Sequence, residues 1–197
     1  MDIPFLGYAL DCILSGTVNL REQRMADLVR TRDVIAVNGL AVEAIEDGRR
    51  LHPGQLDLAW DDLVVVSATG PRGDPAQRLR PTVGHPVRVA VGPYEIAGYL
   101  QAPVGVDPIN HVRRQRVIVL NFAAVRVQGH DGATIHAHQT LLLNGRHNLG
   151  VQVVPDLVVR QLVAQAWDPL RERLEPAAVH QATGGLTARL ARGGILA

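Results

Sequence analysis

The segment VIAVNGLAV at residues 34–42 returns as VIVLNFAAV at residues 117–125, with five of nine positions identical. Around these segments, residues 4–48 align with residues 86–132 when two single-residue shifts are allowed. Two copies of one apolar pattern predict two structures of one kind. The sequence therefore predicts an internal duplication, which decides the architecture but not the chemistry.

Both copies have the composition of short β-strands. The two nine-residue segments are rich in β-branched residues, which favour strands. Gly16 and Gly98 occupy aligned places in the strand before, where a missing Cβ allows a bulge or a sharp bend. Asn144-Gly145 between apolar runs predicts a two-residue type I′ hairpin. Short strands joined by tight turns are typical of small barrels or sandwiches.

The predicted fold is mainly β, with two tandem small β-barrel-like repeats and a C-terminal amphipathic helix. We place the repeats at residues 1–70 and 86–155, separated by a linker at residues 71–85 that has three prolines and two glycines. Apolar residues then recur every three or four positions, which predicts a helix over residues 156–175. Residues 176–197 are rich in glycine and are expected to form a flexible tail.

Composition narrows the function classes. Apolar residues make up 47% of the chain and charged residues 20%, as in ordinary globular proteins. A net charge of +1 provides no overall field to attract nucleic acid or an anionic membrane. The single cysteine, Cys12, excludes an internal disulfide and a cysteine-based zinc site. Without a signal-peptide pattern or an apolar run of ~20 residues, we expect a cytoplasmic protein with no membrane partner.

One stretch resembles known small β domains. In ILSGTVNLREQRMADLVRTRDVIAVNGLAV, residues 13–42, a strand ends in glycine, a polar loop carries Arg-x-x-Asp-Leu and an aliphatic strand follows. This resembles an uncharacterised bacterial family with an Arg-x-Ser-Asp-x-Leu-Asn segment; Gly16, Arg24 and Asp27 match its glycine, arginine and aspartate. The first copy has Val-Arg in place of the family's Leu-Asn, and the second lacks the arginine and has Asn110 where Asp27 stands.

More distantly, the stretch is similar to Sm-like barrels, although neither copy has the C-terminal Sm signature. The resemblance implies a small curved β-sheet or barrel, assembly into rings or sheets and, by analogy alone, contact with RNA.

Two histidines are candidate metal ligands. His136 and His138 lie two apart on a predicted strand, so both rings project to one face with Cβ atoms about 7 Å apart. That spacing suits a shared metal, which needs a third ligand. His147 would lie about 13 Å from His138 across the predicted hairpin, which is too far, whereas His130 or Asp131 could approach from the preceding turn. The alternative is a pair of solvent-facing histidines.

Arginines are candidate contacts for RNA or an acidic partner, because the chain has no lysine. The candidates lie in related loops beside the strongest strands: Arg24, Arg30, Arg32, Arg113, Arg114 and Arg116. No aromatic residues are interleaved to stack bases. The alternative is a set of solvated loop charges paired with acids such as Asp33 and Asp107.

Two further groups of residues have predicted structural roles. Asn38 and Asn121 are polar residues at aligned positions inside the best strands, and we expect their amides to bind a neighbouring loop backbone; the alternative is a shared ligand pocket. The predicted helix needs a surface to cover its apolar face. Its predicted interaction residues are Leu162, Val163, Ala166 and Trp167.

No nucleophile elbow, phosphate-binding loop, catalytic triad or cofactor motif is evident, so we expect no cofactor and no catalysis. The first hypothesis is a self-assembling or partner-binding scaffold module that forms homo-oligomers or binds a second protein. The alternatives are an RNA-binding Sm-like protein that uses the arginine-bearing loops, and a metal-dependent activity at the His-x-His strand.

Overall fold

The computed structural model describes residues 2–21, 23–70 and 81–174, and for residues 167–174 it describes only the helix backbone. The elements of the first half are β1 (Asp2–Tyr8), β2 (Cys12–Asn19), α1 (Met25–Thr31), β3 (Val34–Ala44), β4 (Arg50–Ala59), the short 3-10 helix η1 (Trp60–Asp62) and β5 (Val65–Ser67). Those of the second half are β6 (Thr82–Val91), β7 (Tyr94–Pro103), α2 (Pro108–Val112), β8 (Val117–Gly129), β9 (Gly132–Asn144) and β10 (Gly150–Val153). The helix α3 (Asp156–Leu174) follows.

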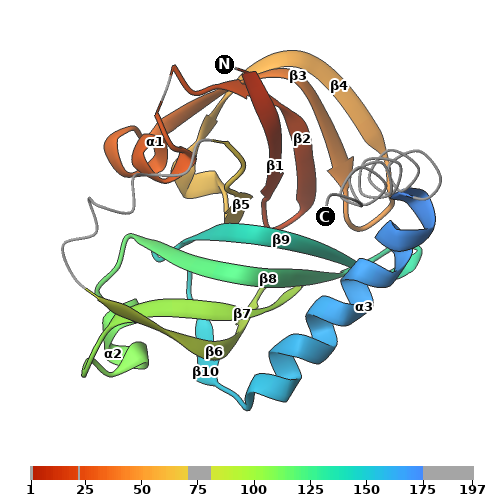
Figure 1. The fold of residues 1–197 in the computed structure, drawn as a ribbon. Coiled ribbons are helices and arrows are strands. Elements are labelled where there is room, and N and C mark those ends of the chain that lie inside the picture. Colours follow the sequence, from red (N-terminus) through yellow and green to blue (C-terminus); the bar gives the residue numbers. More distant parts are fainter. Residues whose placement is uncertain (1, 22, 71–80, 175–197) are drawn as a thin grey trace, which may run out of the picture.

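The described strands form one antiparallel sheet in the order β10-β6-β7-β8-β9-β5-β1-β2-β3-β4, which confirms the mainly β prediction (Figure 1). In the first half, β2 lies between β1 and β3, β3 pairs with β4, and β5 pairs with β1. In the second half, β7 lies between β6 and β8, β8 pairs with β9, and β10 pairs with β6. The halves thus have the same order of strands and α-helices and the same strand pairings, and β5 joins them by pairing with β9.

Both halves have a bulge at the aligned glycine. The register between β2 and β3 shifts at Gly16, and that between β7 and β8 shifts at Gly98. A Cβ on Gly16 would lie 2.7 Å from a methyl carbon of Val37, and one on Gly98 would lie 2.7 Å from the Cβ of Ala123. Because the facing strand approaches this closely, only glycine fits at the two predicted bends.

Each half has an apolar core, and the two cores interlock. Trp60 is fully buried in the first core, and Ile96 and Leu120 are fully buried in the second. Leu142 of β9 belongs to the first core, whereas Tyr8 of β1 belongs to the second. The exchange occurs where β5 lies between β1 and β9, a junction we call the seam.

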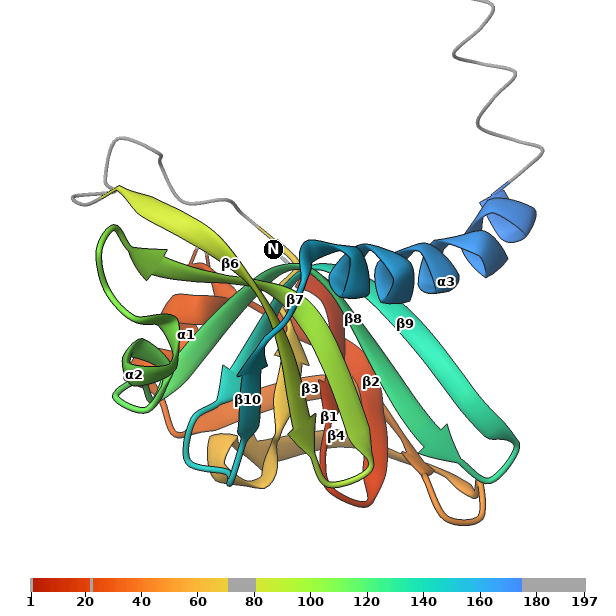
Figure 2. The same ribbon diagram turned by 90° about the horizontal axis from the view of Figure 1, so that it is seen from below.

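The helix α3 crosses the outer face of the second half (Figure 2). Val159, Leu162 and Ala166 are buried against Ala97 of β7 and Ala124 of β8. The small alanine side chains let the helix approach the strands closely. The predicted C-terminal amphipathic helix is therefore confirmed as far as the structure describes it, and it covers the chain's own sheet.

The predicted boundaries need one adjustment. Residues 82–85, predicted to be linker, belong to β6, because they pair with β7. The rest of that linker, residues 71–80, and the predicted tail at residues 176–197 lie outside the described residues. The division into barrel repeats at residues 1–70 and 86–155 stays a prediction.

The predicted hairpin at Asn144-Gly145 is wrong. Asn144 is fully buried, and its amide donates to the backbone carbonyls of Trp60 (2.9 Å) and Leu63 (3.1 Å) in the first half. A Cβ on Gly145 would come within 2.0 Å of the carbonyl oxygen of Gln115. The Asn-Gly pair therefore serves tertiary contacts, and the chain continues to β10 at the far edge of the second half, beside β6.

Asn38 and Asn121 occupy equivalent places but do not have the predicted partners. They lie opposite Thr17 and Tyr99 in the two bulged ladders. The Oδ1 of Asn121 accepts a hydrogen bond from Thr140 of the adjacent strand (3.1 Å), whereas Asn38 is exposed. A strand rather than a loop faces each position, so the predicted bonds to loop backbone are absent from the described part of the chain.

Candidate functional site

A chain of hydrogen bonds crosses the seam. The hydroxyl oxygen of Tyr8 lies 2.9 Å from Nδ1 of His136 and 2.9 Å from Nε2 of His138. The other ring nitrogen of His138 lies 3.1 Å from Oγ of Ser67. A phenol donates one hydrogen bond and accepts another, and a neutral imidazole does the same. The row Ser67–His138–Tyr8–His136 is therefore satisfied when both histidines are neutral.

The surroundings keep this row uncharged. Burial lowers the pKa of His138 to about 4, and the neighbouring His136 acts in the same direction. Burial also lowers the pKa of His136, which Glu43 partly opposes. The pKa of Tyr8 is raised, first by burial and then by Tyr94. At neutral pH the seam thus contains a polar network without a net charge.

The geometry does not complete the hypothetical metal site. His136 and His138 lie on one face as expected, but the nitrogens that face each other bind the same hydroxyl. His147 lies with Nε2 3.2 Å from a backbone carbonyl of the first half, and His130 lies 3.9 Å from Asp131. Within the described residues, no group of three or more His, Cys, Asp or Glu side chains is placed to hold a metal. Metal binding stays a prediction.

Among the residues that the structure describes, two ion pairs connect the halves. Arg116 binds Asp33, and Arg146 binds Asp61. In both pairs the arginine belongs to the second half and the aspartate to the first. The contact between the halves therefore has a charge polarity, with basic groups on one side and acidic groups on the other.

The predicted arginines divide into paired and exposed groups. Arg24 binds Asp27 through two bonds of 2.6 and 2.8 Å, and Arg116 binds Asp33 of the first half. The remaining four are exposed: Arg30, Arg32, Arg113 and Arg114. The helices α1 and α2, beside which they lie, are at the same end of the molecule in both views (Figures 1 and 2). Binding of RNA or an acidic partner stays a prediction.

The sheet ends in two open edges. Among the described strands, none pairs with the outer side of β4 or of β10. Exposed apolar side chains lie at both ends, including Leu56 of β4 and Val153 of β10. An open edge offers unpaired backbone groups to another strand.

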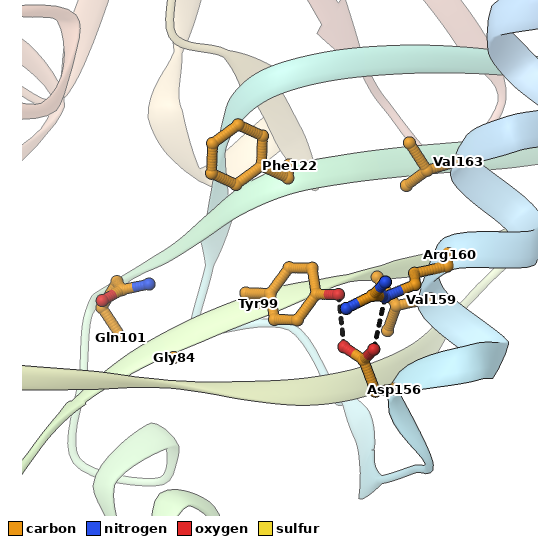
Figure 3. A pocket seen from close by; sticks show the side chains of 8 residues that line it. All are labelled: Gly84, Tyr99, Gln101, Phe122, Asp156, Val159, Arg160 and Val163. Atoms are coloured by element: carbon orange, nitrogen blue, oxygen red, sulfur yellow. Dashed lines mark hydrogen bonds and ion pairs between the residues drawn. The ribbon is translucent and has the colours of Figure 1, made fainter.

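A groove of about 640 Å³ lies beside the beginning of α3 (Figure 3). Strands β6, β7 and β8 form its floor, and α3 forms one wall. Its lining residues are Gly84, Tyr99, Gln101, Phe122, Asp156, Val159, Arg160 and Val163. A groove of this volume with a largely apolar lining and a few polar groups has the character of a ligand site.

Phe122 forms the opposite wall in an unusual conformation. Its side chain is 68% exposed and its φ is 46°, in the left-handed region that disfavours residues with a Cβ. Gly39, the aligned residue of the first half, has a φ of 59°. The bulged backbone therefore requires this conformation in both halves, and an exposed aromatic residue occupies it in only one.

The polar side of the groove is a closed set of contacts. The hydroxyl of Tyr99 donates to one oxygen of Asp156 (2.5 Å), and Nε of Arg160 binds the other oxygen. The Tyr99 hydroxyl is the main cause of the lowered pKa of Asp156, and Arg160 acts in the same direction. The carboxylate is thus ionised, and each of its oxygens has one donor within the groove.

The predicted interaction residues of α3 lie in different environments. Leu162 and Ala166 are buried against the sheet, whereas Val163 lines the groove. The side chain of Trp167 lies outside the described residues. Sequence reasoning did not single out Phe122 as a functional residue, although the alignment sets it against Gly39.

Comparison of the chain with protein-family models, with curated proteins and with solved structures finds no match. In the part of the chain that the structure describes, no helix is both long and apolar enough to cross a membrane.

Proposed function

We propose that the protein is a non-catalytic module that assembles with further copies of itself through β4 and β10. The observation that supports this proposal is the pairing of β5 with β9. It joins the fifth strand of the first half to the fourth strand of the second half. The counterparts of these two strands, β10 and β4, are the open edges. If the halves are small barrel-like copies of one unit, a neighbouring copy can continue the arrangement.

The internal seam supplies a register for this contact. It places Val66 opposite Leu142. The ladder registers make Val151 the counterpart of Val66 and Asp57 the counterpart of Leu142. A contact of the same kind would therefore place Val151 of one copy opposite Asp57 of the next.

Charge supports the same arrangement. The alignment makes Asp33 equivalent to Arg116, and the ladder registers make Asp61 equivalent to Arg146. Repeating the seam between copies would bring Arg116 and Arg146 of one copy toward Asp33 and Asp61 of the next. These charges are opposite in sign and already form pairs inside each chain, so the contact would extend the two ion pairs into a network across copies.

The composition of the edges favours a weak, reversible contact. Leu56 of β4 and Val153 of β10 are 45% and 53% exposed, which leaves apolar area to bury. Asp57, however, stands where the internal seam has Leu142, and a buried carboxylate would cost free energy. Assembly should therefore depend on protein concentration.

The experiment is native mass spectrometry with light scattering over a range of concentrations. Asp57→Leu should tighten association, because burying a leucine contributes roughly 1.5–3 kcal/mol, about tenfold or more in affinity. Asp57→Asn is the matched control, which removes the charge without adding apolar area. A chain that stays monomeric at every concentration, with Asp57→Leu monomeric as well, would refute the proposal.

The β10 edge has its own test. Val154 donates its N–H to Pro86 of β6 (3.0 Å), so strand alternation directs the N–H of Val153 outward. Val153→Pro removes that donor and should weaken association, whereas Val153→Thr keeps it and should assemble like the original chain. Equal assembly of the two variants would contradict the use of this edge.

A further inference from the structure

The starting point is the contrast between Phe122 and Gly39. Both occupy the bulge that follows the aligned asparagine, and both have a positive φ. Glycine adopts this conformation without steric cost, whereas for phenylalanine the same conformation is sterically unfavourable. Packing offsets little of this cost, because Phe122 is 68% exposed. A residue that is unfavourable for the backbone and adds little to the core suits a role in binding.

The position of Phe122 gives that role a place. In Figure 3 its ring stands on one side of the groove, Val163 and Val159 stand on α3 at the other, and Tyr99 lies on the floor. Gly84 lines the floor and adds no side chain to it. An apolar body placed here would contact aromatic and aliphatic side chains on several sides.

The free polar atoms define the other part of the ligand. Both oxygens of Asp156 are engaged, and Oε1 of Gln101 lies 3.2 Å from the hydroxyl of Thr82. Among the described residues, Nε2 of Gln101 has no hydrogen-bond partner. The guanidinium of Arg160 has five N–H donors; its Nε binds Asp156, it also hydrogen-bonds the Tyr99 hydroxyl, and the remaining N–H groups can donate to a ligand. The groove thus has donors to offer and few acceptors, which favours an anionic or acceptor-rich group.

We infer that the groove binds a small amphipathic organic anion. Its apolar body lies between Phe122 and α3, and its acidic group lies at Arg160 and Gln101. The volume of about 640 Å³ is within the range of small-molecule sites. This inference does not depend on self-assembly, because the groove lies on the face of β6, β7 and β8, whereas the proposed assembly uses the edges of β4 and β10.

Two fluorescent probes test the inference on the full chain. The first, 8-anilino-1-naphthalenesulfonate, has an apolar body and an anionic group, and the second, N-phenyl-1-naphthylamine, is its uncharged counterpart. Both should bind, and the sulfonate should bind more tightly. Phe122→Gly should weaken both probes at least tenfold, and Arg160→Met should weaken the sulfonate selectively.

Thermal unfolding separates binding from structure. Phe122→Gly gives the second half the residue that the first half has at this bulge, so its melting temperature should not fall. Leu51→Ala removes a side chain of similar exposure, 67%, from β4 and should leave probe binding unchanged. The inference is overturned if neither probe binds, if Phe122→Gly binds both like the original chain, or if it loses binding only together with its melting temperature.

Discussion

Acidification should destabilise the protein through the buried histidines of the seam, well before its carboxylates protonate. His138 has its pKa lowered from 6.5 to about 4. Its neutral form is favoured in the folded state, so the unfolded chain takes up a proton first as the pH falls. The contribution of His138 to the free energy of unfolding is therefore fully present above pH 6.5. It declines as the pH falls from 6.5 to the pKa of the folded state.

The size of the effect follows from the shift. Each pKa unit corresponds to about 1.4 kcal/mol, so His138 alone contributes a loss of about 3 kcal/mol, most of it by pH 4.5. The lowered pKa of His136 acts in the same direction. Asp27 and Asp47 also have lowered pKa values, but acids of this kind lose their contribution only below their ordinary value of 3.8. The interval from pH 6.5 to 4.5 therefore isolates the histidines.

Urea denaturation at fixed protein concentration, at several pH values from 7.5 to 4.5, measures this loss. His138→Gln cannot titrate and retains an amide near Tyr8, so its stability should depend much less on pH in this interval. His52→Gln, which replaces an exposed histidine of β4, should follow the original profile. The reasoning is refuted if the original chain loses less than about 1 kcal/mol, or if His138→Gln loses as much as the original chain.

Two further predictions concern the loop after β9, and both are measured by urea denaturation at pH 7. Gly145→Ala should cost at least about 2 kcal/mol, because its Cβ would come within 2.0 Å of the carbonyl oxygen of Gln115, whereas Gly150→Ala, with 3.5 Å to the nearest atom, should cost much less. Asn144→Ala should cost roughly 2–4 kcal/mol, because two buried backbone carbonyls of the first half lose their donor. A change of less than about 0.5 kcal/mol in either variant would contradict the role assigned to that residue.

The strands could be predicted from the sequence because their signals are local. Runs of β-branched residues fixed the positions of β3 and β8, and the missing side chains of Gly16 and Gly98 marked the bulges. The Asn-Gly pair failed as a hairpin signal because its local preference was overridden by buried bonds to the first half. Local preference cannot indicate which distant strand will lie beside a given edge.

The site was only partly predictable for the same reason. The period of a strand places His136 and His138 on one face, but their shared partner, Tyr8, is 128 residues away from His136 in the chain. The groove combines β6, β7 and β8 with α3, and no local pattern joins these elements. Phe122 is the exception, since its alignment with Gly39 already sets a bulky residue against a glycine.

The differences between equivalent positions explain why the halves meet in one way. Leu142 inserts into the core of the first half, whereas its counterpart Asp57 is charged. Within one chain the tether between the halves raises the effective concentration of the internal contact, so the leucine-bearing seam forms first. The edge with Asp57 would then be left for the proposed contact between copies, which would form only at higher concentration. Replacing Asp57 with leucine should remove this ranking, so that pairing between chains competes with pairing inside one chain and larger assemblies appear at lower concentration.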